Sequence, residues 1–200
     1  MNKMPEKRDF AQMCELYRDW NEKINVVSRK DIDNLFEHHI LHSLALFEYM
    51  QRRGLLEDGL EILDLGTGGG FPGIPLASVM PGSHFTLCDS IAKKIKVAQA
   101  VADGLDLKNV TCVNARAETL SGPFDWVVSR AVTSLDAFYP WVKGKFTKGI
   151  LYLKGGDVMA EIAEMCAKCK VDSAKVSVWP VNDWLKDDYF AEKFVIEIRK

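Results

Sequence analysis

Glycines and carboxylates that could bind a charged ligand gather in one stretch of the sequence, residues 63–76. Four glycines fall within the five positions from Gly66 to Gly70, and Asp64 comes two residues before the first of them. Glycine allows positive φ and lets a backbone approach a ligand closely. An apolar run precedes the glycines, and two prolines follow at positions that suit the first turn of a helix. Strand, glycine loop and helix in this order favour a nucleotide-type binding site over a chance glycine-rich turn.

The glycines leave two classes of nucleotide open. Gly68, Gly70 and Gly73 fit the G-x-G-x-x-G pattern of dinucleotide-binding folds. Asp64 favours a different ligand, because an acid there would place negative charge beside a pyrophosphate. Its carboxylate suits a cationic group such as the amino-acid end of S-adenosylmethionine, held directly or through water. Asp89, which ends the next predicted strand, would bind two ribose hydroxyls in either class, or would only cap the helix after it.

The elements that must position these residues alternate between strands and helices. Apolar segments bounded by turn residues predict strands near residues 60–65, 84–88, 110–113, 124–128, 149–153, 175–178 and 194–198. The alternation implies a Rossmann-like α/β fold, with a mostly parallel seven-stranded sheet, helices on both faces and an antiparallel addition from the last two strands. Ligands of such sheets lie at the carboxyl ends of the strands. The predicted strand ends are Gly66, Asp89, Asn114, Ser129 and Lys154.

The first 58 residues are predicted to form a helical extension, ahead of a cofactor-binding core at residues 59–200. Apolar residues spaced by three and four place one buried face on the first helix. They are Phe10, Met13, Tyr17, Trp20 and Ile24. Ser28 or Asp31 could cap a second helix that runs to about Arg53. Ser90 is the expected cap of the helix after the second strand.

Three histidines and a pair of cysteines raise the question of a metal site. His38 and His42 are one helical turn apart, as in the H-E-x-x-H zinc motif, but position 39 is a histidine rather than the glutamate that acts as general base. Cys166 and Cys169 form one C-x-x-C without the two further ligands that zinc needs. We therefore expect no metal. The histidine turn is interpreted as structural or as the rim of the site, and the cysteines as core packing.

Length and composition predict one globular domain of 200 residues, 48% of them hydrophobic. No run of eighteen apolar residues occurs, and Met1–Phe10 lacks an apolar signal core, so we expect a cytoplasmic protein without a membrane segment. The net charge is −2, but no acid occurs from Trp141 to Gly156. This run is either a solvated face or a surface that contacts phosphates. Its lysines are Lys143, Lys145, Lys148 and Lys154.

The glycine stretch resembles motif I of class I methyltransferases. Its continuation, Phe71-Pro72-Gly73-Ile74-Pro75-Leu76, is similar to the glucose-inhibited division protein B family, bacterial enzymes that methylate N7 of a guanine in small-subunit ribosomal RNA. Further matched segments are the one around Asp89 and residues 115–118, 129–131 and 153–156. The resemblance is dense from Asn25 to Asp157 and weak beyond it. It implies S-adenosylmethionine as cofactor, small-subunit ribosomal RNA or a ribosomal subunit as partner, and an enzyme that we expect to be a monomer.

The resemblance also implies roles for individual residues. Arg130 and Lys154 are the implied catalytic residues: Arg130 contacts the cofactor or the target nucleotide, and Lys154 holds RNA phosphate or polarises the guanine carbonyl, unless it is only a solvated lysine. The loop around Ala117 and Glu118 would border the adenine. The implied cofactor-binding residues are Asp64, Gly66, Gly68, Gly70, Phe71, Asp89, Ala117, Glu118 and Arg130. The family's His-Ile-x-x-Ser segment is matched at residues 39–43, but His42 stands where the family commonly carries Asp.

The segment after the fourth strand predicts the kind of acceptor. Ser129-Arg130-Ala131 lacks the Asn or Asp, the prolines and the aromatic residue typical of enzymes that methylate exocyclic amines, and it has no cysteine for attack on a pyrimidine. A ring nitrogen such as guanine N7 has a free lone pair and no proton to lose, so positioning would supply most of the rate. Two alternatives stay open: a nicotinamide-dependent oxidoreductase on a related fold, and a non-catalytic RNA-binding ribosome-assembly factor.

Overall fold

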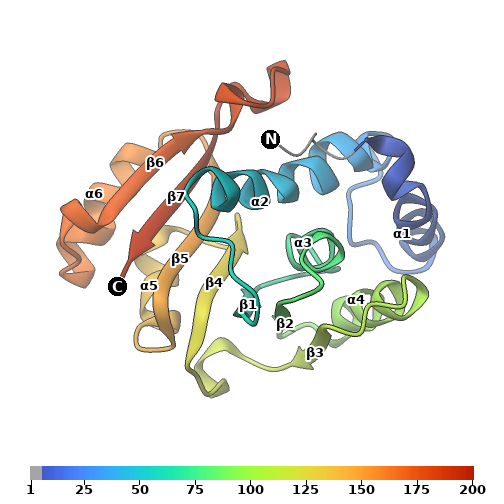
Figure 1. Ribbon diagram of the computed structural model, residues 1–200, viewed down its shortest axis with the longest axis horizontal. Coiled ribbons are helices and arrows are strands. Elements are labelled where there is room, and N and C mark those ends of the chain that lie inside the picture. Colours follow the sequence, from blue (N-terminus) through green and yellow to red (C-terminus); the bar gives the residue numbers. More distant parts are fainter. Residues whose placement is uncertain (1–5) are drawn as a thin grey trace.

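The computed structural model describes residues 6–200, so half of the segment Met1–Phe10 lies outside the described residues. A seven-stranded sheet with the order β3-β2-β1-β4-β5-β7-β6 forms its centre (Figure 1). β1 to β5 are parallel, and β7 runs antiparallel to both of its neighbours, β5 and β6. The strands are β1 (Glu61–Leu65), β2 (His84–Asp89), β3 (Val110–Asn114), β4 (Phe124–Arg130), β5 (Phe146–Gly155), β6 (Val176–Pro180) and β7 (Lys193–Arg199).

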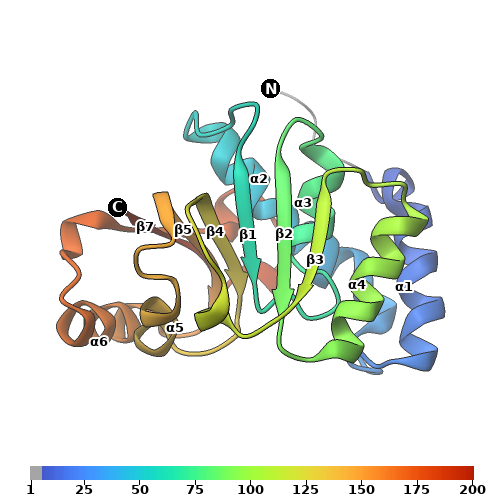
Figure 2. The ribbon, with the colours of Figure 1, turned by 90° about the horizontal axis from the view of Figure 1, so that it is seen from below.

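Both faces of the sheet are covered by helices, because the central strands carry apolar residues on both sides. In β4, Trp126 and Val128 belong to one apolar cluster, whereas Val127 between them belongs to the other. The first cluster lies under α2 (His42–Arg52), α3 (Gly73–Val79) and α4 (Ala92–Gly104), with α1 (Ala11–Lys23) beside α4 (Figure 2). The second lies under α5 (Leu135–Val142) and α6 (Val158–Cys169). The α/β class, the parallel core and the antiparallel closing pair are confirmed.

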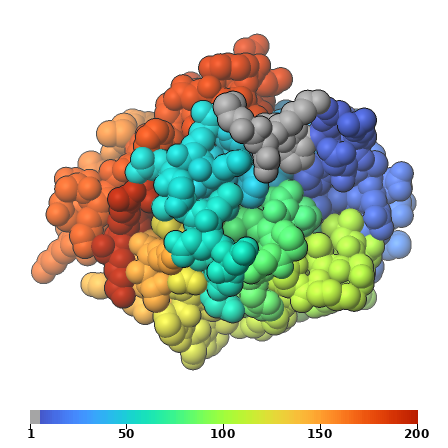
Figure 3. Space-filling view, viewed as in Figure 1, coloured from blue at the N-terminus to red at the C-terminus, as the bar shows by residue number. Residues whose placement is uncertain are grey.

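The N-terminal segment shares its core with the sheet. Tyr17 of α1 is fully buried in the same cluster as Leu44 of α2 and Val128 of β4. In the space-filling view, α2 lies between the C-terminal segment and the residues around α3 (Figure 3). The division into residues 1–58 and 59–200 therefore stays a prediction about folding units.

The prediction of one uninterrupted second helix is wrong. A 3-10 turn (Ile32–Asn34) and a π-helical turn (Leu35–Leu41) precede α2. Asp31 stands at the start of this segment, but its carboxylate does not cap the backbone, because His38 and His39 hold both of its oxygens. Ser90 is likewise not the cap of α4: Ile91 occupies the N-cap position, and no side chain caps the helix.

Candidate active site

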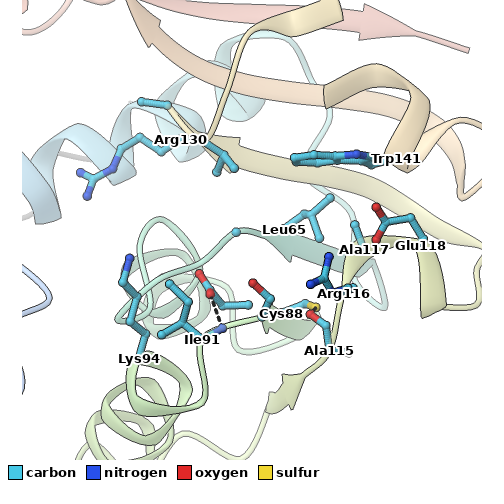
Figure 4. A pocket seen from close by; sticks show the side chains of 15 residues that line it. Leu65, Cys88, Ile91, Lys94, Ala115, Arg116, Ala117, Glu118, Arg130 and Trp141 are labelled. Atoms are coloured by element: carbon cyan, nitrogen blue, oxygen red, sulfur yellow. Dashed lines mark hydrogen bonds between the residues drawn. The ribbon is translucent and has the colours of Figure 1, made fainter. Parts of the chain in front are cut away.

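A cleft that encloses about 460 Å³ opens at the carboxyl ends of the parallel strands. Residues from β1, β2, β4, the loop after β3, and helices α4 and α5 contribute to it (Figure 4). Its lining residues are Leu65, Gly66, Cys88, Asp89, Ser90, Ile91, Lys94, Ala115, Arg116, Ala117, Glu118, Arg130, Ala131, Val132 and Trp141. Of the predicted cofactor-binding residues, Gly66, Asp89, Ala117, Glu118 and Arg130 are in this lining.

Asp89 connects the glycine loop to the start of α4. Its Oδ2 accepts the N–H of Gly68 at 2.9 Å, and its Oδ1 accepts the N–H of Ile91 at 2.8 Å. Because an ionised carboxylate has about four lone-pair sites, it can accept ribose hydroxyls while keeping both contacts. Asp89 thus faces the cleft, and its contact with Ile91 forms the turn just before α4, whose first turn has no side-chain cap.

Asp64 is buried behind the loop and outside the cleft lining. Its Oδ2 accepts the Thr67 hydroxyl at 2.5 Å and the N–H of Gly73 at 2.7 Å, which ties β1 to the start of α3. Its Oδ1 is buried with no hydrogen-bond partner among residues 6–200. Burial raises the pKa of the Asp64 carboxyl to about 7. A buried acceptor without a donor is costly, so this oxygen is suited to a water or an ammonium group.

The second half of the glycine loop faces the N-terminal segment. A Cβ on Gly70 would lie 2.7 Å from Oη of Tyr17, and a Cβ on Gly69 would lie 2.7 Å from Cβ of Val26. The ring of Phe71 stacks on Tyr17 with centroids 4.4 Å apart. Gly70 and Phe71, both predicted to bind cofactor, are therefore placed against α1 and the segment after it, outside the cleft lining.

The far wall of the cleft consists of the loop after β3 and α5. Ala117 and Glu118 lie there as predicted, and Trp141, which the sequence analysis missed, faces them (Figure 4). Two large apolar side chains of the lining are unusually exposed, Ile91 at 41% and Val132 at 38%. Together these residues offer an apolar surface that a flat ring would cover. The acid-free surroundings of Trp141 were visible in the sequence, but its helix placement was not.

Three of the four lysines in the acid-free run are held by the protein. The Lys145 ammonium donates to the carbonyls of Ala117, at 2.5 Å, and Leu120, at 2.8 Å, so it supports the loop of the far wall. Lys148 pairs with Glu57 at the other end of β5. Of the four, only Lys143 and Lys145 have no carboxylate within ion-pair distance among residues 6–200. The four lysines therefore do not form one surface of unpaired cations that would be available to contact phosphates.

Lys154 lies beside the cleft but not in its lining. Its ammonium pairs with Glu161 of α6 at 2.8 Å and donates to the carbonyl of Thr133 at 2.9 Å. It therefore braces the segment that carries Val132 into the cleft. The alternative of a solvated lysine does not describe it, since only 13% of its side chain is exposed.

The guanidinium of Arg130 points away from Trp141, toward the π-helical turn (Figure 4). It donates to the carbonyl of His38 at 3.2 Å and lies 2.9 Å from Nδ1 of His39. It also lies over the Phe71 ring, 5.2 Å from the centroid. Burial lowers the pKa of Arg130 from its ordinary high value. The guanidinium is nevertheless charged at neutral pH, because arginine does not lose its proton in proteins.

The histidine turn lies between Arg130 of β4 and the rings of Tyr189 and Phe190. Within residues 6–200, no group of three or more His, Cys, Asp or Glu side chains is arranged to hold a metal ion. His42 is buried against the rings of Tyr189 and Phe190, and the His38 carbonyl is near its imidazole but outside hydrogen-bond geometry. In the same range of the chain, no helix has both the length and the apolar character needed to cross a membrane.

Comparisons with known proteins agree with this geometry. Curated relatives named ribosomal RNA small subunit methyltransferase G include one from Flavobacterium psychrophilum, 47% identical over 94% of this chain and 88% of the relative. Another, from Christiangramia forsetii, is 48% identical over 94% of this chain and 87% of the relative. Among solved structures, magnesium protoporphyrin IX methyltransferase from Synechocystis with bound SAM matches with a TM-score of 0.67 and 15% identity, over 97% of this chain and 92% of that one, which shows the fold alone.

The family model GidB, described as rRNA small subunit methyltransferase G, matches residues 6–183. The resemblance to the glucose-inhibited division protein B family is thereby confirmed over nearly the whole chain. The curated relatives span most of both sequences, and this chain belongs to the GidB family, rRNA small subunit methyltransferase G.

Proposed function

We propose that this chain transfers the methyl group of S-adenosylmethionine to N7 of a guanine in small-subunit ribosomal RNA. The family and the names of its curated members support methylation of this RNA. The observation that carries the choice of cofactor is Oδ1 of Asp64, which is buried with no hydrogen-bond partner among residues 6–200, because a buried carboxyl oxygen behind the glycine loop fits a cation and opposes a pyrophosphate. This disfavours the nicotinamide alternative.

The residues that line the cleft, together with Asp64 buried behind the glycine loop, fit the cofactor. Asp64 would hold its ammonium group, directly or through water, and Asp89 its ribose hydroxyls. Ala117, Glu118 and Trp141 would border its adenine, with Ile91 covering the ring from the α4 side. S-adenosylmethionine supplies a methyl group on a sulfonium centre, which reacts with a nucleophile without further activation.

The protein's own contribution to the reaction is position and charge. Guanine N7 attacks with a lone pair and loses no proton, so no general base is needed. His39, whose ring contacts Arg130, is not placed to act as one, because both of its ring nitrogens are engaged by Arg130 and Asp31. Burial lowers the pKa of His39 to about 4, so it is a weak base at neutral pH. Arg130 would orient cofactor or guanine by charge, and Lys154 would keep the Val132 segment in place.

Methyl transfer from labelled S-adenosylmethionine to small ribosomal subunits that lack the modification tests the proposal. We expect label in the RNA and, after nuclease digestion, in 7-methylguanosine. Calorimetry with S-adenosylhomocysteine and NAD provides the second arm, with binding expected only for the former. Cofactor binding without transfer would instead favour a ribosome-assembly factor, and tight NAD binding an oxidoreductase. The cytoplasmic location and the monomeric state expected from the sequence stay predictions.

A further inference from the structure

Four polar side chains between the N-terminal segment and the end of β4 form one connected network. Asp31 stands at its centre: Oδ1 lies 2.5 Å from Nδ1 of His38, and Oδ2 lies 2.6 Å from Nε2 of His39. The other ring nitrogen of His39, Nδ1, lies 2.9 Å from a guanidinium nitrogen of Arg130. His39 therefore bridges a carboxylate on one side and a guanidinium on the other.

The hydrogen-bond roles within the network have one consistent assignment. A guanidinium can only donate, so Nδ1 of His39 must accept and carries no proton. The single proton of the neutral ring is then on Nε2, where it is donated to Asp31. Burial raises the pKa of Asp31, but the hydrogen bonds from His38 and His39 outweigh it, and the net pKa is lowered. Asp31 is thus an ionised acceptor. It selects the His39 tautomer with the proton on Nε2, which leaves Nδ1 free to accept a hydrogen bond from Arg130.

Arg130 depends on this arrangement because it has no direct carboxylate partner. Among the described residues, none of the ion pairs within 4.0 Å includes Arg130. Asp31 balances the charge of Arg130 indirectly, through the neutral His39 ring. A second guanidinium nitrogen donates to the His38 carbonyl, which belongs to the same π-helical turn. That carbonyl also accepts the hydroxyl of Tyr189, whose ring stacks on His38 at 3.7 Å.

We propose that Asp31 and His39 are positioning residues for methyl transfer, which fix the direction of the Arg130 guanidinium at the edge of the cleft. The carboxylate of Asp31 sets the tautomer of His39, and His39 sets the orientation of Arg130. This inference rests on the proposed function, since Arg130 matters only if it orients cofactor or guanine there. It goes beyond the family assignment, which names no residue as acting through Arg130.

Three substitutions separate this role from ordinary packing. Asp31→Asn keeps the shape but no longer requires a donor on Nε2 of His39, so both tautomers become accessible. His39→Asn can place an acceptor near the former Nδ1 position, whereas His39→Gln can reach Asp31 but offers Arg130 no acceptor there. The matched control is His38→Phe, which keeps a ring for Tyr189 and the backbone carbonyl for Arg130, and removes only the other contact of Asp31.

The test combines single-turnover methyl transfer to small ribosomal subunits with nitrogen-15 spectra of the histidine rings, which report the tautomer directly; the chain has four histidines. We expect Asp31→Asn and His39→Gln to lower the rate by about tenfold to a hundredfold, as for a misplaced reacting group. His39→Asn should retain more activity than His39→Gln, and His38→Phe should stay within about twofold of wild type, a change too small to displace a reacting group. S-adenosylhomocysteine affinity is measured in parallel on each folded variant.

The inference is overturned if Asp31→Asn and His39→Gln are folded and as fast as wild type, or if His39 keeps its proton on Nδ1 in the wild-type spectrum. It is also overturned if His38→Phe is as slow as Asp31→Asn, because the effect would then come from the packing of the turn. Where a variant is unfolded, the wild-type spectrum still decides. A wild-type protein that transfers no methyl group would refute the proposed function instead, and the spectra of wild type and Asp31→Asn would still test the tautomer.

Discussion

The two halves of the glycine loop have the same composition but different surroundings. Gly66 lines the cleft, where a Cβ on it would overlap a methyl group of Val132. Gly68 donates to Asp89, and a Cβ on it would meet only the Lys94 side chain, at 4.0 Å. Gly69 and Gly70 face the N-terminal segment, where a Cβ would overlap Val26 or Tyr17. Tyr17 also donates its hydroxyl to the Gly69 carbonyl at 3.0 Å.

This difference indicates that the motif has two structural roles. Gly68 has open space around its Cα, whereas Gly69 and Gly70 allow α1 and the segment after it to close against the loop. The residues beyond it continue the division, because Phe71 stacks on Tyr17 and lies under Arg130 instead of in the cleft. Substitutions in the two halves should therefore affect different measurements.

Gly70→Ala should cause the largest loss of stability. Its φ of +115° is strained for any residue with a Cβ, and that atom would overlap Tyr17 Oη and Ile74. We expect a loss of about 2–5 kcal/mol in the free energy of unfolding, from backbone strain and overpacking together. Gly68→Ala is the matched control: with φ +57° and open space, it should cost only about 1–2 kcal/mol. Equal losses in urea unfolding would erase the distinction between the halves.

Asp89→Ala should act on the ligand more than on the fold. The carboxylate faces the cleft and holds Gly68 and Ile91, so its removal takes away the ribose acceptor and loosens the loop. S-adenosylhomocysteine binding should weaken by about 1.5–3 kcal/mol, as for hydrogen bonds to a charged group. Calorimetry on the folded variant measures this. Unchanged affinity would reduce Asp89 to the start of α4.

Asp64 should make cofactor affinity depend on pH. Burial raises the pKa of Asp64 to about 7, so below that pH the ligand-free protein must release a proton before the carboxylate can pair with an ammonium group. Affinity for S-adenosylhomocysteine should rise by up to about tenfold per pH unit below pH 7 and level off above it. Asp64→Asn should bind more weakly with a flat profile. A wild-type profile as flat as that of the variant would place the cofactor's ammonium elsewhere.

The same group has a consequence for the ligand-free fold. Because its pKa is raised above the unfolded value, the native protein binds more protons than the unfolded chain between about pH 4 and pH 7. Its contribution to stability is therefore fully present below about pH 4 and is lost as pH rises through 7. Comparing the unfolding free energy of wild type and Asp64→Asn across this range isolates the contribution.

Lys145→Met should weaken cofactor binding although Lys145 is outside the cleft lining. Its ammonium holds the carbonyls of Ala117 and Leu120, so its loss frees the loop that borders the adenine. We expect about 1 kcal/mol, or several-fold in affinity by calorimetry. Lys148→Met is the control, because it removes an exposed ion pair with Glu57 that contributes roughly 0–1 kcal/mol and does not touch the loop. Similar affinities for the two variants would contradict the role of Lys145.

The sequence predicted the parts of this molecule that follow from local patterns. Apolar runs located all seven strands with ends shifted by at most three residues, and the ends of parallel strands located Gly66 and Asp89 at the cleft. The fold and the family follow from such local signals. Such patterns extend over a few residues, so they predict the features of the fold that depend on a single segment.

Contacts between distant segments were not visible in the sequence. Trp141 faces Ala117 only because α5 packs beside the loop after β3, and Arg130 meets His39 across 91 positions of the chain. The local sequence around Asp31 predicts a helix cap. In the structure, His38 and His39 occupy both of its carboxylate oxygens instead. Lys145 and Lys154 resembled free cations because their partners come from other elements.

The smallest expected effect concerns the pH dependence of the chemical step. Attack by N7 removes no proton, and His39, the histidine beside Arg130, has a pKa lowered to about 4 by burial, so it stays neutral throughout the useful range. With cofactor and RNA saturating, the single-turnover methyl-transfer rate should be nearly flat between about pH 6.5 and 8.5, where a histidine base would give a slope. The titration of Asp64 should then appear in cofactor affinity and in the stability of the ligand-free protein, but not in this rate.

Arg130→Ala should sharpen this result by lowering the rate while leaving the profile flat, because it removes a positioning charge and no proton acceptor. A wild-type rate that rises about tenfold per pH unit in the window would indicate an acceptor that must lose a proton, and would contradict the N7 assignment. Substrate RNA with 7-deazaguanine at the target position gives the matching check, since it keeps the shape of the base and removes only the nucleophile. Methylation of that base would exclude N7. If methylation is lost with 7-deazaguanine and the pH profile of the natural substrate is flat, this side of the cleft contributes only the orientation of cofactor and guanine.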